Sequence, residues 1–163
     1  MPKTYDKIAT QTLGSASASV TFSSIPATYT DLVVVASANS AAANNFFYLQ
    51  FNGDTSTNYS YTRLFGDGST AISDRTTNFA AGLVGYVSST IKTTSIVQIM
   101  NYANTTTFKT FISRASNTTV WAAAIVGLWR ATPAAINEVK FIMGSSDNTL
   151  AGSTFTLYGI KSA

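Results

Sequence analysis

The side chains of this sequence that could carry acid–base chemistry are seven carboxylates: Asp6, Asp31, Asp54, Asp67, Asp74, Glu138 and Asp147. Acid–base hydrolysis needs two carboxylates brought together. Most of these acids stand in turn contexts, where an aspartate commonly bonds the local backbone. We therefore expect them to stabilise turns and not to form a catalytic pair.

The sequence has no histidine and no cysteine. A serine nucleophile needs an activating base, and imidazole is the commonest one. Ser89 and Lys92 match a bare Ser-x-x-Lys spacing, but they stand in a polar stretch between expected strands. Without cysteine, neither a disulfide nor thiol chemistry is available. We predict no catalytic residues and a protein that is not an enzyme.

Two polar loops have residue types that calcium prefers. A calcium site needs several oxygen ligands from a compact segment, and 52–56 and 145–148 each offer carbonyls but only one carboxylate. Asp67 with Asp74 would be the next pair to test. One carboxylate per loop favours plain turns, so we predict no metal and no cofactor.

Aromatic side chains beside polar ones would suit a glycan. The candidates are Tyr59, Tyr61, Trp121 and Trp129. Aromatic residues of a β-sandwich core give the same pattern and are the favoured reading.

The composition points to a neutral surface. Only 10% of the 163 residues are charged, and 45% are hydrophobic. Ser, Thr and Asn must cover the exterior, which suits a protein that stays packed against neighbours or belongs to an extracellular particle. The ten basic residues are scattered singly and give a net charge of +3, so we expect no binding to nucleic acid.

The sequence shows no membrane or export signal. The opening residues 1–5 lack the apolar stretch of a signal peptide. The longest apolar run, 121–129, is shorter than the roughly 20 residues that cross a bilayer. We expect synthesis in the cytoplasm and no contact with membranes.

Alternating hydrophobicity and many β-branched or aromatic residues predict an all-β chain. The predicted strands are Ile8–Leu13, Ser19–Ser23, Asp31–Ala38, Phe46–Phe51, Tyr59–Phe65, Phe79–Val87, Ser95–Tyr102, Thr107–Ser113, Trp121–Trp129, Glu138–Met143 and Thr154–Ile160. We read Ala36–Asn45 as a loop, and Pro133 can begin one helical turn through 134–136.

So many closely spaced strands predict a two-sheet antiparallel β-sandwich or a closed barrel, and the length favours a jelly roll over an immunoglobulin-like domain. Residues 8–163 would form a single β-sandwich domain. Residues 1–7 would be a short N-terminal arm or a frayed terminus.

Several strand-and-turn blocks resemble a family of small structural proteins of tailed phages, including phages of cyanobacteria and marine bacteria. The closing block is Leu150–Ile160, and the others are Ile8–Leu13, Val20–Pro26, Tyr29–Leu32, Phe51–Asp54 and Asn58–Tyr61. The resemblance implies a jelly-roll sandwich located in the virion. The family brings no catalytic residues.

This resemblance implies a capsid decoration (cement) protein that binds the major capsid protein and itself, preferably as a trimer, on the capsid surface. The expected contact residues are Pro2, Lys3, Thr4, Tyr5, Tyr59 and Tyr61. The alternative is a receptor- or glycan-binding domain of a tail fibre or baseplate. A third hypothesis, a hydrolase of host polysaccharide, rests only on Asp54, Asp67, Asp74 and Asp147.

Overall fold

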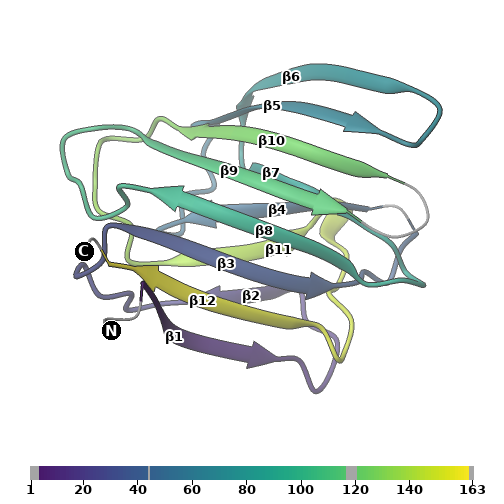
Figure 1. Ribbon diagram of the computed structural model, residues 1–163, viewed down its shortest axis with the longest axis horizontal. Helices are drawn as coiled ribbons and strands as arrows, with labels where there is room; N and C mark the ends of the chain where they lie inside the picture. The colour runs from purple at the N-terminus through teal and green to yellow at the C-terminus, as the bar shows by residue number, and fades with distance from the viewer. Residues whose placement is uncertain (1–3, 44, 117–120, 162–163) are drawn as a thin grey trace.

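The computed structural model describes residues 4–43, 45–116 and 121–161, and it forms two antiparallel β-sheets. Eight strands form the larger sheet in the order β1-β12-β3-β8-β9-β10-β5-β6, in front in Figure 1, and the order β2-β11-β4-β7 forms the smaller sheet behind it. The strands are β1 (Tyr5–Thr12), β2 (Ser19–Phe22), β3 (Asp31–Ala38), β4 (Asn45–Phe51), β5 (Tyr59–Gly66), β6 (Ala71–Phe79), β7 (Gly82–Val87), β8 (Thr93–Met100), β9 (Lys109–Ser116), β10 (Ala122–Trp129), β11 (Val139–Met143) and β12 (Thr154–Ile160). A single 3₁₀ turn, η1 (Gly144–Ser146), stands between β11 and β12.

The strand pairing is that of a jelly roll. β1 pairs with β12, β2 with β11, β3 with β8 and β4 with β7. These four pairs are nested in chain order, as if one long hairpin had been rolled up, and they alternate between the two sheets. This is the eight-stranded, double-sheet arrangement of a jelly roll, so the β-sandwich predicted from the sequence is confirmed.

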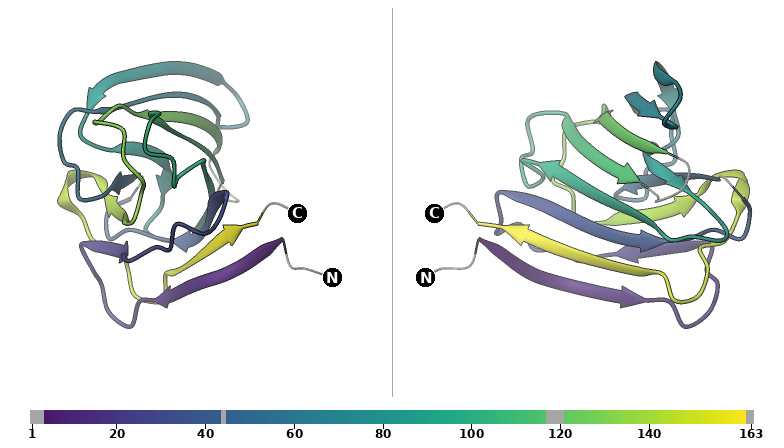
Figure 2. Two further views of the ribbon diagram at one scale, coloured as in Figure 1. Left: turned by 90° about the vertical axis from the view of Figure 1, so that its left-hand side faces the viewer. Right: turned by 45° about the vertical axis from the view of Figure 1, so that its right-hand side comes forward.

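Two hairpins are added to this framework. β5 and β6 are inserted between β4 and β7, and β9 and β10 between β8 and β11. The added strands extend the larger sheet beyond β8, and they curl over β7, as the left view of Figure 2 shows. A second small core fills the curl, and its buried members are Tyr48, Tyr61, Ala81, Leu83, Ala123 and Ile125.

The main core lies between the two sheets and follows the alternation of the strands. Phe47, Leu49 and Phe51 of β4 face it with at most 1% exposure, because alternate residues of a strand share one side. Phe155 and Leu157 of β12 meet them from the larger sheet. The rings of Phe47 and Phe155 lie 6.1 Å apart between centroids. The register of both strands is therefore set by which alternate residues are apolar.

Arg63 ties the β5–β6 hairpin to the aromatic residues beneath it. Its guanidinium pairs with Asp74 across the two strands, with Nε donating to Oδ1 at 2.6 Å. The same group lies over the rings of Phe65, at 4.8 Å, and Tyr86, at 5.4 Å. Cation–π attraction adds to the ion pair because the site is partly shielded from water.

Several sequence predictions need correction. Strand β6 was not predicted, because its residues are polar and exposed on almost every position, which hides the alternation of a half-buried strand. The predicted strand Phe79–Val87 contains the end of β6, a turn and β7. No helical turn forms at 134–136, where Ile136 instead enters the core and bonds the carbonyl of Tyr102.

The first strand begins earlier than predicted. Tyr5–Lys7 were assigned to an N-terminal arm, but they belong to β1 and pair with Ile160, Gly159 and Tyr158 of β12. Backbone hydrogen bonds to β12 satisfy polar groups that a free arm would leave to water. Pro2 and Lys3 lie outside the described residues. The loop predicted for Ala36–Asn45 is confirmed for residues 39–43, but 36–38 belong to β3 and Asn45 begins β4.

We expect Gly127→Ala to destabilise the protein by about 1–3 kcal/mol, the usual cost of overpacking a core. The ring of Phe111 lies directly on Gly127 and Gly82, so an added methyl group would overlap it. Urea unfolding of the variant measures the loss. Gly14→Ala is the control, because nothing lies within 4 Å of its added carbon. An equal stability of both variants would contradict this packing, and Phe111→Leu should reduce the cost.

The β5–β6 turn gives a pH prediction. Hydrogen bonds from the backbone N–H groups of Thr70 and Ser69, and from the Ser69 hydroxyl, lower the pKa of Asp67 to about 2. Since the folded pKa lies below 3.8, the ordinary value of an aspartate, the ionised turn is favoured above pH 3.8 and is lost as the pH falls toward 2. Carboxyl NMR titration should show this midpoint, and Ser69→Ala should raise it. A midpoint near 3.8 in the unchanged protein would refute the assignment.

Candidate interaction surface

The outward side of β8, β9, β10 and β5 exposes apolar side chains. Ile112 stands opposite Val126 in the β9–β10 register, and Leu64 stands opposite Ala124 in the β10–β5 register. Leu64 is 57% exposed, Val126 55% and Ile112 40%. Successive residues of a strand point to opposite faces, so Ile125, next to Val126, is fully buried. We call this side of the four strands the apolar face, and Figure 1 looks onto it.

The apolar face is hollowed because some of its residues are small. Ala122 and Ala124 lie between Leu64, Ile96 and Arg114, and the resulting open groove has a volume of about 590 Å³. A second hollow of about 300 Å³ lies on the other side of Val126, and its outward lining residues are Ser60, Thr62, Arg75, Thr110 and Leu128. These two hollows have room for larger side chains of a partner protein.

The charged side chains at the apolar face are all basic. Arg114 on β9 and Arg75 on β6 have outward side chains, as their register with Ala124 and Thr62 shows. No carboxylate stands among the outward residues of β5, β6, β8, β9 and β10. Asp74 points to the other side of β6, where it pairs with Arg63. The apolar face therefore presents guanidinium groups without acidic partners.

A row of hydroxyl groups continues the same side of the sheet toward β1. The register places one hydroxyl residue of each of five neighbouring strands in a line: Thr12, Thr154, Ser37, Thr94 and Ser116. Neighbouring strands are about 4.8 Å apart, so the row offers evenly spaced neutral donors and acceptors. The two parts together form a broad side of the molecule that has little charge.

Two predicted contact residues are in the interior. Tyr59 is fully buried and Tyr61 is 6% exposed, because odd-numbered residues of β5 point inward. The Tyr59 hydroxyl accepts a 2.8 Å hydrogen bond from the N–H of Phe51, and burial raises its pKa. The prediction that these tyrosines contact a partner was wrong: alternation showed which residues share a side, but not which side is covered.

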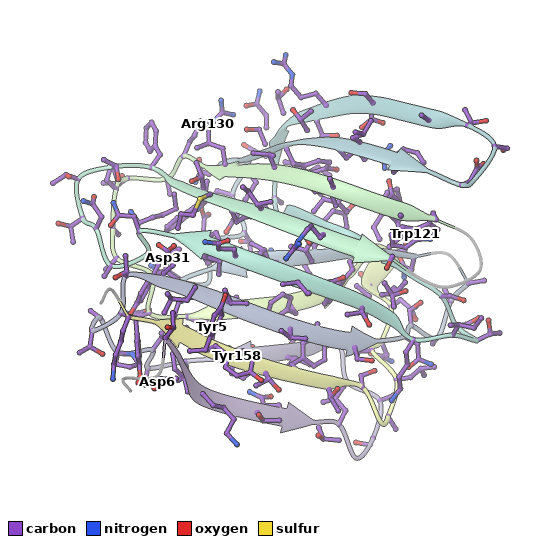
Figure 3. All side chains as sticks on the ribbon, viewed as in Figure 1. Tyr5, Asp6, Asp31, Trp121, Arg130 and Tyr158 are labelled. Carbon is purple, nitrogen blue, oxygen red and sulfur yellow. The ribbon has the colours of Figure 1, made fainter. Side chains whose placement is uncertain are left out.

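The two tryptophans that were candidates for glycan binding pack against other aromatic side chains. Trp129 is 4% exposed and stacks on Tyr59, with 6.4 Å between ring centroids. Its indole N–H donates to Oδ2 of Asp54 at 2.6 Å. Trp121 packs edge-on against Tyr86 at 4.8 Å, at the right-hand end of β10 in Figure 3. Trp129 lies in the main core, and Trp121 is partly buried against the second core, in line with the interpretation that the sequence favoured.

The remaining predicted contact residues lie at the edge of the larger sheet. Tyr5 is 55% exposed and its ring meets Tyr158 edge-on at 6.3 Å, as the labels in Figure 3 show. Thr4 is exposed, and its carbonyl accepts a bond from the N–H of Lys161. Both residues are accessible on this edge.

The four aspartates of the hydrolase hypothesis have different local partners. Asp54 is bonded by Asn58 and Trp129, Asp67 by its own turn, Asp74 by Arg63 and Asp147 by Asn45. Burial raises the pKa of Asp54, but the hydrogen bonds from Asn58, Trp129 and Ser56 outweigh it and lower the pKa. Over 4–43, 45–116 and 121–161, no three acidic residues gather as metal ligands would. The acids act as turn and hairpin anchors.

The residues of the apolar face were missed because they resemble core residues in the sequence. Ile125, Val126 and Leu128 belong to the single apolar run 121–129, yet they alternate between the two sides of β10. The buried partners Ile125 and Trp129 share the odd positions, and this parity is the signal that separates Val126 from them.

Comparison with known protein families found no matching family model, and no curated protein sequence matches the chain. Within the part of the chain that the structure describes, no helix is long and apolar enough to cross a membrane.

A pair of identical substitutions tests the apolar face. We expect Val126→Thr to change the free energy of unfolding by less than about 0.5 kcal/mol, because its side chain is already in water. Val97→Thr should cost about 1–3 kcal/mol, because Val97 is fully buried and its new hydroxyl would lose water. Chemical denaturation compares them. A large loss in Val126→Thr would mean that this side chain is packed.

Proposed function

We propose that this protein is a structural component of a phage virion, a capsid decoration protein that acts through contact and not through catalysis. The observation that carries the proposal is the apolar face, where Leu64, Ile112 and Val126 are exposed together. Monomeric soluble proteins rarely leave contiguous apolar side chains in water, and such patches mark sites of association. The resemblance of the strand-and-turn blocks supplies the setting.

The proposed mechanism is mechanical. Seating the apolar face on a shell subunit removes its side chains from water, and a standard interface of roughly 1,600 Å² stabilises the contact. Few charged groups need to be desolvated, because the face and the neighbouring hydroxyl row are mostly neutral. Each bound copy would thus add free energy of association to the shell.

The basic side chains at the apolar face favour one kind of partner. Two copies meeting through this face would place Arg75 and Arg114 of both copies in one interface without a carboxylate from these strands, and like charges oppose association. A partner with aliphatic side chains bordered by carboxylates would satisfy both parts of the face. We therefore assign the apolar face to the major capsid protein. Contacts between copies, in the trimer that the resemblance implies, would use other surfaces, such as the β1 edge with Thr4 and Tyr5.

The number of copies in each virion distinguishes a decoration protein from the alternative, a domain of the tail. A decoration protein is expected in hundreds of copies in each virion, and a receptor- or glycan-binding tail tip in a few dozen at most. Quantitative mass spectrometry of purified virions of the phage that encodes this chain measures the number. A low copy number would favour the tail location.

The contact face is tested by Val126→Asp. We expect at least tenfold weaker binding to capsids that lack the protein, since the new carboxylate would be buried in an apolar contact. Co-sedimentation measures the affinity, and circular dichroism confirms the fold. Ser15→Asp adds the same charge to an exposed loop and should bind normally. Unchanged binding of a folded Val126→Asp variant would exclude this face.

A further inference from the structure

A separate cavity of about 420 Å³ lies on the other side of the molecule, against the outer side of the smaller sheet. Its lining comes from β4, from the end of β6 with the turn that follows it, from the end of β11 with η1 and Asp147, and from Ala18. Ligand pockets typically measure about 300–1,000 Å³, so it has room for a small molecule. The apolar face takes no part in it.

One wall of the cavity is aromatic. Phe79 stands at the end of β6, and its ring lies 5.3 Å from that of Tyr48, tilted by 38°. Tyr48 is 8% exposed, whereas Phe79 is 36% exposed. The ring of Phe79 thus offers an accessible apolar surface and packs against the buried ring of Tyr48.

Another part of the lining is a strained polar turn. Ser145 and Ser146 of η1 both have left-handed backbones, with φ of 53° and 55°. This region is unfavourable for residues other than glycine, and such strain collects at ligand sites. Both serines are exposed where they border the cavity. The turn is fixed from below, since Asn45 donates a 3.0 Å hydrogen bond to the carbonyl of Gly144.

The carboxylate of Asp147, which follows the turn, is held in place by hydrogen bonds. Its Oδ2 accepts hydrogen bonds from the N–H of Ala42 at 2.8 Å and from Nδ2 of Asn45 at 3.1 Å. The hydrogen bond from Ala42 is the main cause that lowers the pKa of Asp147, so the carboxylate is ionised at neutral pH. These bonds hold the carboxylate in place among the lining residues of the cavity.

Gln50 completes the polar lining. Its side chain is 5% exposed, and its Nε2 donates to the carbonyl of Ala80 at 3.0 Å. This bond holds the amide in one orientation beside the turn that leads from β6 to β7. The cavity therefore combines a buried, oriented amide with a carboxylate, two hydroxyls and an aromatic ring, and its lining residues include no lysine or arginine.

We propose that this cavity binds a neutral saccharide, one or two sugar rings in size, with its C–H groups on Phe79 and its hydroxyls on Asp147, Gln50 and the two serines. A sugar has an apolar face and a hydroxyl rim, which correspond to the aromatic and the polar parts of the lining. The Asp147 carboxylate disfavours uronic acids, sialic acids and phosphates by charge repulsion, since no lysine or arginine is among the lining residues. The inference is independent of the apolar face and of decoration.

The direct test is an NMR titration of ¹⁵N-labelled protein. The probes are glucose, galactose, mannose, N-acetylglucosamine, N-acetylgalactosamine, lactose, maltose and cellobiose, each taken to tens of millimolar. We expect at least one to give saturable shifts of the amides of Ala80, Ala81 and residues 144–147. No saturable shift with any probe, or shifts confined to another part of the molecule, would overturn the proposal.

Substitution of Phe79 and a comparison with acidic sugars test the proposed role of its ring and the preference for neutral sugars. Phe79→Ala should weaken binding of the active sugar at least tenfold, and Phe79→Leu is the second variant if the first unfolds. Phe108→Ala removes a phenylalanine that is 52% exposed elsewhere, and it should bind normally. Glucuronate or galacturonate should bind at least tenfold more weakly than its neutral parent. Unchanged affinity in a folded Phe79 variant, or equal affinity for the acid, would refute the site as described.

Discussion

The structure depends on a layer of aromatic rings packed between the two sheets. Phe47 and Phe51 of the smaller sheet meet Phe155 and Phe111 of the larger one, with ring centroids about 6 Å apart. Edge-to-face and offset pairs of this kind contribute roughly 0.5–1.5 kcal/mol each beyond the burial of their area. No disulfide is possible in this chain, and the described residues form only two ion pairs. Shape complementarity in this layer is therefore the main constraint on the fold.

The aromatic layer also explains where glycine is required. Phe111 reaches across the sandwich and lies against Gly82 of β7 and Gly127 of β10. Gly127 has outward neighbours on its own strand, Val126 and Leu128, so the glycine that accommodates the core ring stands between residues of the exterior. The inner packing and the relief of the apolar face are thus linked through one strand.

The additions to the jelly roll contribute to both proposed sites. β9, β10 and β5 carry most of the apolar face, while the end of β6 supplies the ring that faces the saccharide cavity. The Arg63–Asp74 pair and the rings around it fix this hairpin against the sandwich. The inserted hairpins thus supply much of the surface proposed to contact other molecules, while Gln50 of β4 and the η1 turn, which also line the cavity, belong to the nested framework.

The fold could be predicted to a large extent because strand alternation is a local property. Phe47, Leu49 and Phe51 stand at alternate positions of one predicted strand, so their spacing alone places them on one side. The inserted strand β6 escaped because an exposed edge strand has no apolar side to reveal it. The sites were less accessible to prediction, because each joins segments that are distant in the sequence: Phe79 meets Tyr48, and Asn45 meets Asp147 across 102 positions.

By itself, the sequence determined that this chain is all-β and which alternate residues of a strand share a side, because both follow from local spacing. It also determined the residue types available, with neither imidazole nor thiol among them. Only the tertiary structure decided which side is covered. Tyr59 and Val126 look equally apolar in their strands, yet one lies under the smaller sheet and the other faces water. Burial depends on the elements that pack above a strand, and those come from elsewhere in the chain.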